Sequence, residues 1–286
     1  MQKKTIGLLF AGVVVAGVIG FALVNSGTKK DDSITIRSAT AKKMDVTETL
    51  STSGTLIPNK IENLVGTGTV NTLNVQIGDT VEKNQVLANY DNGLTLTAGM
   101  KGTVTEVNIH TGQPDTAAQQ GKASIVVSDL TNLKIQLALS NSEARQVTVN
   151  QKAVITSGRH QYAGQVTQKD PTATSPQTAT GGATLGAVVT FTDKPKELYA
   201  GFSADVAISV ATAKDALAIP IEALTYNEKN EPIVYEVKDN KAKIVKVETG
   251  IQSDQFIVIK KGITDGKSVI LSPTSDLKDG SAVTKE

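Results

Sequence analysis

The stretch GTVNTLNVQIGDTV (Gly68–Val81) is followed thirty-four positions later by a near copy, GTVTEVNIHTG (Gly102–Gly112). Both copies begin with Gly-Thr-Val, carry an Asn in the middle and reach a Gly ten positions after the first one. A single copy is too short to bury its apolar face alone, whereas two copies can close a small sandwich. The repeat therefore predicts one domain made of two half-domains.

Each copy is expected to be a strand followed by a turn. In the first copy, Gly78 can adopt a positive φ and Asp79 can accept hydrogen bonds from the backbone, as a turn requires; Gly112 matches Gly78 in the second copy. VLANYD, ending at Asp91, corresponds to SIVVSD, ending at Asp129, at an offset of thirty-eight, so the second half carries a four-residue insertion. The expected apolar strand positions of the first copy are Val70, Leu73, Val75 and Ile77.

Composition excludes several classes of protein. The formal net charge is +1 with no long Lys/Arg run, so nucleic acid is not an expected partner. The chain has no Cys and only two histidines, His110 and His160, fifty residues apart, and it carries no sequence motif of a hydrolase, metalloprotease or nucleotide-binding site. We therefore expect no enzymatic activity, no cofactor and no metal.

The amino terminus carries a stretch that can cross a membrane. Ile6–Val24 is nineteen residues without a charge, and a helix of that length spans roughly 28 Å, close to the hydrocarbon thickness of a bilayer. Lys3 and Lys4 favour a cytoplasmic amino terminus, which places the rest of the chain outside the membrane in a single-pass arrangement. A cleaved signal peptide is the alternative to an uncleaved anchor.

From Ile34 onward the chain alternates apolar and polar residues and is rich in Val, Ile and Thr, which predicts a mainly β protein. One short helix is expected after Ser140, because Ser140 and Glu143 have the spacing of a capping box. Residues 171–186 contain few large apolar side chains and are expected to form a loop between two strands, a binding segment being the alternative.

The repeated phrase resembles the biotinyl/lipoyl fold. In carriers of that fold a modified Lys stands at the tip that joins the halves, but here the tip is Asp91-Asn92-Gly93, without a Lys. Lys101 precedes the strand of the second half, so a carrier role would need an attachment at a position that the fold does not use.

The chain as a whole resembles the membrane fusion proteins, the periplasmic adaptor subunits of efflux pumps, including HlyD-like and macrolide-exporter adaptors. The phrases that carry the resemblance occur in the family's order: DVTETLSTSGTLIP (45–58), the repeat, VSDLTNLKIQLALSNSEARQVTVNQKAVI (127–155) and AIPIEAL (218–224). The resemblance implies a transmembrane anchor with flanks (1–32), strands joining the membrane-proximal and barrel modules (33–62), a lipoyl-like domain (63–130), a β-barrel domain (131–212) and a membrane-proximal domain (213–286).

Many family members carry a long helical hairpin between the lipoyl halves that reaches an outer-membrane channel. Here the short turn Asp91–Gly93 replaces it, since no heptad pattern lies between the halves. We therefore expect a cell with a single membrane, of Gram-positive type.

The resemblance implies a non-enzymatic adaptor that forms a ring, six-membered by family analogy, on the outer face of an ABC permease and its ATPase. In macrolide-exporter adaptors a ring of glutamines in a loop of the second half is thought to gate the conduit. Here Thr111 precedes the Gly where that Gln is usual, so Gln113 is the remaining gate candidate; both can equally be ordinary polar turn residues. A surface-anchored β-rich binding or structural protein is the alternative function.

Overall fold

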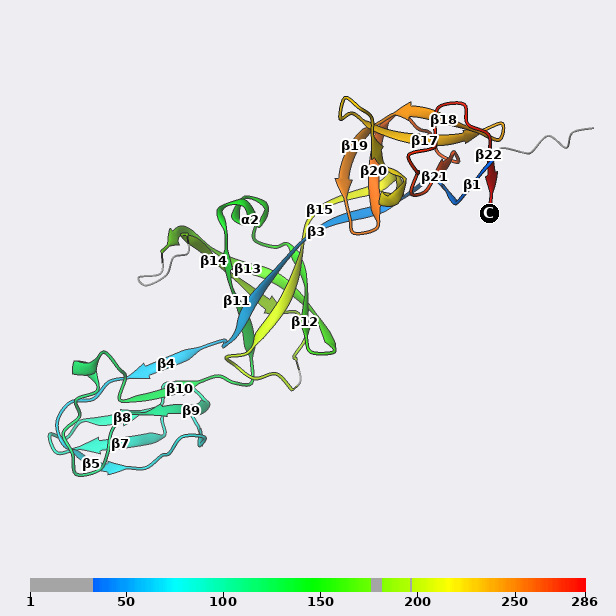
Figure 1. Ribbon diagram of the computed structural model, residues 1–286. Coiled ribbons are helices and arrows are strands. Elements are labelled where there is room, and N and C mark those ends of the chain that lie inside the picture. Colours follow the sequence, from blue (N-terminus) through cyan, green and yellow to red (C-terminus); the bar gives the residue numbers. More distant parts are fainter. Residues whose placement is uncertain (1–32, 176–181, 196) are drawn as a thin grey trace, which may run out of the picture. The chain divides into compact units, whose positions relative to one another are not determined.

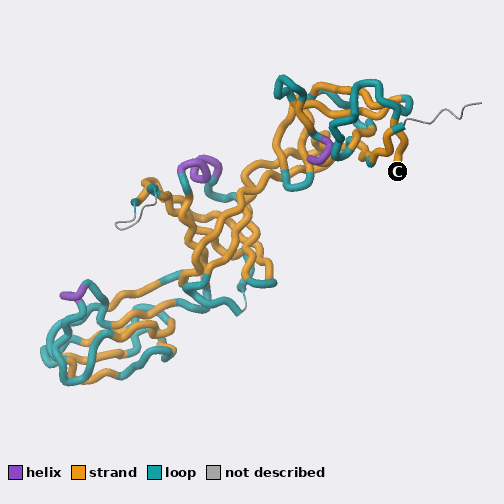
Figure 2. Tube along the Cα trace, in the orientation of Figure 1, coloured by secondary structure: helices purple, strands orange, loops and turns teal. Residues whose placement is uncertain are grey.

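The structure is a computed structural model that describes residues 33–175, 182–195 and 197–286. The predicted anchor, Ile6–Val24, lies outside these residues. Within the described parts of the chain, no helix is both long enough and apolar enough to span a bilayer. Strands and loops make up nearly all of the trace in Figure 2, and helix is confined to short segments. The prediction of a mainly β protein is confirmed.

The two copies of the repeat fold into one domain, here called the two-half domain (Figure 1). It has a four-stranded sheet in the order β4-β10-β9-β6 and a three-stranded sheet in the order β5-β7-β8. Its elements are β4 (Ile61–Leu64), β5 (Val70–Leu73), β6 (Thr80–Val81), β7 (Val86–Tyr90), β8 (Thr95–Thr97), β9 (Gly102–Val107), the 3-10 turn η1 (Ala118–Gln120) and β10 (Ile125–Ser128).

The turn of each half is hydrogen-bonded to a strand of the other half. The Gly78 N–H donates to the Val104 carbonyl at 2.9 Å, and the Gly112 N–H donates to the Val70 carbonyl at 2.7 Å. Val104 and Val70 return the bond, donating to the carbonyls of Asp79 and Gln113 at 2.9 and 3.0 Å. Since each position differs from its counterpart by thirty-four, the turn of each copy of the repeat is held by the strand that starts the other copy.

Most of the expected apolar positions of the first copy face the core of this domain. Val70 and Val75 are buried, and Leu73 packs against the core at its edge. Ile77 was wrongly expected to face inward: its side chain is 64% exposed, because the strand ends at Leu73 and Ile77 already belongs to the turn before Gly78.

Six strands pair in a closed circuit, here called the barrel. The order is β12-β13-β14-β11-β3-β15, and β15 pairs back to β12. Alternate residues of these strands point inward, as period-two patterning requires, and form a core that includes Leu56, Ile135, Ile155 and Ile208. The strands are β3 (Lys42–Pro58), β11 (Leu133–Leu139), β12 (Lys152–Ser157), β13 (His160–Thr174), β14 (Thr184–Phe191) and β15 (Ser203–Pro220).

The predicted capping box is confirmed. The helix α2 (Asn141–Gln146) begins after Ser140, whose Oγ accepts from the Glu143 N–H while the Glu143 carboxylate accepts from the Ser140 N–H. The segment 171–186 contains more strand than expected, because β13 and β14 continue into it and pair Ala173 with Leu185 and Thr174 with Thr184.

The remaining strands build a C-terminal module from both ends of the described chain. The strand β2 (Ser38–Thr40) pairs with β21 (Ser268–Ile270), and β1 (Ile34–Ile36) pairs in parallel with β22 (Val283–Lys285). A sheet in the order β16-β17-β21-β2, with β18 paired to β17, completes the module. Its other elements are η2 (Ile221–Ala223), β16 (Thr225–Tyr226), β17 (Pro232–Lys238) and β18 (Lys241–Lys246), and β19 (Glu248–Gln252) and β20 (Phe256–Lys261) extend the sheet that contains β15.

Candidate functional site

The turn that joins the two halves is short and internally bonded. The Gly93 N–H donates to the Tyr90 carbonyl at 3.1 Å, and Gly93 has a φ of 84°, a conformation in which a Cβ is unfavourable. The Asn92 carboxamide donates to the Thr67 carbonyl at 2.8 Å. Together these bonds fix the chain reversal between the two halves.

Asp91 fastens this turn to the start of the repeat. Its Oδ1 accepts from the Thr69 N–H at 3.0 Å, and its own N–H donates to the Thr69 carbonyl at 3.0 Å. The backbone hydrogen bond from Thr69 holds the pKa of the Asp91 carboxyl below its ordinary value, because it stabilises the charged form. Asp91 therefore acts as a charged backbone clamp at an exposed position.

The loop with the gate candidates lies against the same segment. Pro114 forms a bridge with Thr69, and the Asp115 N–H donates to the Gly68 carbonyl at 2.9 Å. The structure thus brings the turn Asp91–Gly93 and the loop Thr111–Gln113 together around residues 67–70. It does not bring the turn of Gly78 and Asp79 there, since that turn lies on Val104.

The reciprocal arrangement also makes Gln113 the structural counterpart of Asp79. The Asp79 carboxylate accepts from the Gln76 N–H at 2.9 Å and so closes its own turn. The side chain of Gln113 is exposed and, among the described residues, has no hydrogen-bond partner, and Thr111 is exposed beside it. Gln113 is therefore the side chain of this loop whose amide is available to another molecule.

A polar cluster beneath the loop was not identified from the sequence. The Tyr90 hydroxyl donates to Asp115 Oδ2 at 2.7 Å, and the Ser124 hydroxyl donates to the same oxygen at 2.6 Å. Asp115 Oδ1 accepts from the Ala117 N–H at 3.0 Å, and the Gly66 N–H donates to Ser124 Oγ at 2.8 Å. Tyr90 and Ser124 are buried, so Asp115 ties the insertion of the second half to the end of the first half.

Burial, followed by the hydrogen bond to Asp115, raises the pKa of the Tyr90 phenol. The phenol therefore remains protonated and serves as a donor at any physiological pH. Within the part of the chain that the structure describes, no three His, Cys, Asp or Glu side chains converge as a metal site would need.

Lys101 does not stand where a carrier attaches its cofactor, and His110 does not stand in a cluster of metal ligands among the described residues. Lys101 stands just before β9 and pairs with Glu82. It is therefore not at the tip between the halves. His110 is exposed in the turn that precedes Gly112.

Comparisons with known proteins agree with this architecture. Residues 216–285 match the family model described as the C-terminal permuted SH3-like domain of YknX. The chain is 29% identical over 209 residues to the "Putative efflux system component YknX" of Bacillus subtilis, covering 70% of this chain and 54% of that protein. It is 30% identical over 94 residues to the "Multidrug resistance protein MdtA" of Xenorhabdus bovienii, covering 33% of this chain and 23% of that protein.

Among solved structures, MacA from Actinobacillus actinomycetemcomitans superposes with a TM-score of 0.67 at 16% identity, over 82% of this chain and 99% of that one, which shows a shared fold. The chain spans about half the length of YknX and less of MdtA. The order of the repeat, the barrel and the C-terminal module, the matched YknX domain and the two efflux relatives lead to one conclusion. These similarities support a place for the chain among the periplasmic adaptors of efflux systems, the membrane fusion proteins.

Proposed function

We propose that the chain is the non-enzymatic adaptor subunit of an ABC-type export system, with an extracytoplasmic ring that sits on the permease and follows its ATP cycle. The observation that carries the proposal is the match to a named efflux component over 70% of this chain. The reciprocal turns of the two-half domain support it, because they make a rigid building block from which a conduit wall can be assembled. Six copies in the ring follow from family analogy.

The way the chain enters its first strand supports a membrane-proximal position for the C-terminal module. If Ile6–Val24 is the anchor, eight residues separate it from Ser33, and they reach at most about 28 Å. β1 begins at Ile34, whose N–H donates to the Ala282 carbonyl at 2.9 Å. We infer that the C-terminal module lies next to the membrane, in a single-pass arrangement with the bulk of the chain outside.

The tight turn Asp91–Gly93 supports action in a cell with a single membrane, of Gram-positive type. The turn stands where other adaptors carry a hairpin, and its hydrogen bonds to Thr67 and Thr69 hold it close to the domain. It therefore provides no segment that could reach a second membrane. Recovery of the protein bound to an outer-membrane channel would contradict this part of the proposal.

We assign the loop Thr111–Gln113 to the wall of the conduit, with Gln113 as its polar contact. The free amide of Gln113 and the clamps on both sides of the loop support this assignment, because a gate needs a fixed backbone and an available side chain. Gln113→Ala should change the coupling of transport to ATP hydrolysis. Gln76→Ala is the matched control, because Gln76 is an exposed Gln in the corresponding turn of the first half.

The adaptor role is tested by purifying the tagged full-length protein from its native membranes in mild detergent and identifying the co-purifying proteins by mass spectrometry. We expect an ABC permease and its ATPase in amounts comparable to the chain, and a ring-sized complex after crosslinking. Recovery of the chain alone, with and without crosslinking, would refute the proposal and favour a surface-anchored binding protein.

A further inference from the structure

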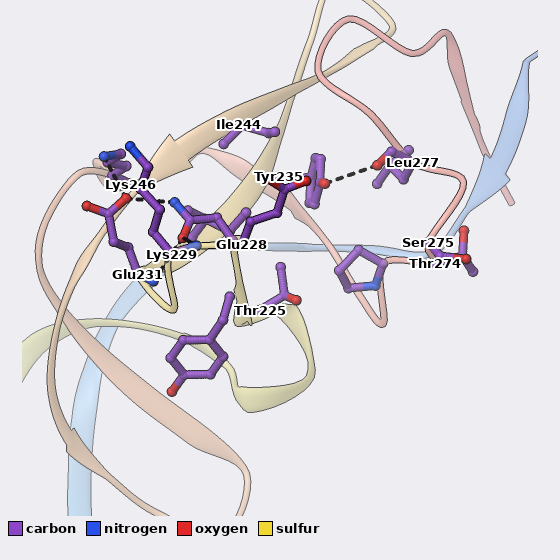
Figure 3. A pocket seen from close by; sticks show the side chains of 14 residues that line it. Thr225, Glu228, Lys229, Glu231, Tyr235, Ile244, Lys246, Thr274, Ser275 and Leu277 are labelled. Atoms are coloured by element: carbon purple, nitrogen blue, oxygen red, sulfur yellow. Dashed lines mark hydrogen bonds and ion pairs between the residues drawn. The ribbon is translucent and has the colours of Figure 1, made fainter.

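The C-terminal module contains a cleft of about 620 Å³ that none of the roles above uses (Figure 3). Its floor is one face of the sheet: Ile233 is buried there, and Ile244 and Tyr235 stand opposite each other on β18 and β17. The Tyr235 hydroxyl donates to the Leu277 carbonyl at 3.0 Å, which fixes the ring as part of one wall. The cleft is therefore preformed and mainly apolar at its base, as binding sites commonly are.

Two apolar side chains at this cleft remain in contact with solvent. The Tyr226 side chain is 57% exposed and that of Ile244 is 37% exposed. Four charged side chains line the cleft: Lys246 and Glu231 form an ion pair at 2.7 Å, and Glu228 and Lys229 carry opposite charges. Lys246, followed by the Asn227 amide, lowers the pKa of Glu231, so the Glu231 carboxylate stays ionised at neutral pH. The rim therefore requires no net charge from a ligand.

Only some of the outward-facing backbone groups of β18 beside the cleft are hydrogen-bonded. In the register of β17 and β18, the backbone groups of Ala242, Ile244 and Lys246 point away from β17. The Ala242 N–H donates to the Ser281 carbonyl at 2.9 Å, and the Ile244 N–H donates to Asp279 Oδ1 at 2.8 Å. Beyond this point, within the described residues, no strand pairs with β18 at the Ile244 carbonyl and the Lys246 N–H, and Gly262 lies against the Lys246 carbonyl, where the open part of the edge ends.

We propose that this open edge of β18, with the cleft beside it, binds an extended peptide segment of a partner protein whose alternate side chains are uncharged and aliphatic. The segment would continue the line of residues 279–282 along β18, accept from the Lys246 N–H and donate to the Ile244 carbonyl. Main-chain bonds to a sheet edge provide affinity, and a cleft on one face selects alternate side chains. Ile244 and Tyr226 provide the apolar contact.

The test uses the purified full-length protein in detergent and a fluorescent synthetic peptide in which valine and threonine alternate. Fluorescence anisotropy should show saturable binding. A probe N-methylated at alternate residues keeps its side chains but loses main-chain donors, and it should bind about tenfold more weakly. Failure of the plain probe to bind, or equal binding of both probes, would overturn the proposal.

Two variants locate the contact. Lys246→Pro removes the outward N–H without breaking the bonds to β17, and proline is tolerated on edge strands; it should weaken binding about tenfold. Lys246→Ala is the matched control, because it removes the side chain and keeps the N–H, and it should bind within about twofold of the native chain. Equal weakening by both variants would place the contact at the side chain and refute the edge. Because the purified chain is used alone, the result is independent of the adaptor role.

Discussion

Tyr90→Phe should loosen the loop that carries the gate candidates while leaving the rest of the domain intact. The substitution removes one donor, the hydroxyl 2.7 Å from Asp115 Oδ2, and keeps the buried ring. A hydrogen bond to a charged group contributes about 1.5–3 kcal/mol. Because Asp115 keeps its bonds from Ser124 and Ala117 and is only half-buried, we expect the lower end of this range, about 1.5 kcal/mol.

Hydrogen exchange measured by mass spectrometry detects this change locally. A loss of about 1.4 kcal/mol corresponds to a tenfold change in the opening equilibrium, so the backbone amides within residues 113–117, Pro114 excepted, should exchange about tenfold faster in Tyr90→Phe. Tyr235→Phe is the matched control, because it removes a phenol bond to Leu277 in the other module and should leave residues 113–117 unchanged. Equal protection of this loop in the native chain and in Tyr90→Phe would refute the reasoning.

The same variant has a pH signature. The folded pKa of Tyr90 lies above its unfolded value, so the phenol's contribution is fully present below about pH 10 and is lost as the pH rises toward the folded value. The alkaline loss of protection at residues 113–117 should be smaller in Tyr90→Phe. An identical alkaline profile in both proteins would show that another group is responsible.

The remaining predictions concern stability measured by chemical denaturation. Gly78→Ala and Gly112→Ala should each lower the free energy of unfolding by about 1–2 kcal/mol, because both glycines have a positive φ, 96° and 80°, and neither has a neighbouring atom that an added Cβ would strike. A destabilising Gly78→Ala together with a neutral Gly112→Ala would contradict the equivalence of the two turns. Ser140→Ala should lower the free energy of unfolding by about 1 kcal/mol, because it removes the side chain that caps α2. The hydrogen bonds from Ser140 lower the pKa of Glu143, so their contribution to stability is fully present above about pH 4.3 and is lost as the pH falls further. The free energy of unfolding should therefore fall less steeply with acid in Ser140→Ala than in the native chain. An equal slope in both proteins would refute this. Lys169→Met should lower the free energy of unfolding by about 1–2 kcal/mol, because its ammonium donates to two carbonyls at the end of α2 at 2.6 and 2.9 Å; an unchanged free energy of unfolding would exclude that role.

The fold of the two-half domain follows from the sequence to the extent that it depends on local patterns. Val70 and Val75 are buried, as expected for apolar positions of the repeat, and the turn glycines stand where positive φ is needed. The repeat predicts that the halves pair, but it does not say that each turn is held by the other half. That exchange depends on hydrogen bonds between residues far apart in the chain, such as Gly78 with Val104 and Gly112 with Val70, which no local rule contains.

The candidate site was less accessible to sequence reasoning. Ile77 has the residue type of a core position but stands in a turn, since hydrophobicity does not report where a strand ends. Asp115 lies in the insertion of the second half, so it has no counterpart in the first half from which a role could be inferred. Its partners Tyr90 and Ser124 are twenty-five and nine positions away. Only the folded chain shows that this polar set is one cluster.

The order of modules along the chain is nested, and this nesting explains why the ends of the chain matter to its proposed role. The two-half domain is inserted between β3 and β11 of the barrel, and the barrel strands are themselves inserted between β2 and β16 of the C-terminal module. The segment matched by the family model, residues 216–285, therefore lacks β1 and β2, the strands that complete this module in the structure. The first described strand, β1, pairs in parallel with β22, so the module is closed by strands from both ends of the described chain. A shortened chain that begins after β2 should therefore lose the partners of β21 and β22, although it keeps every residue that the family model matches.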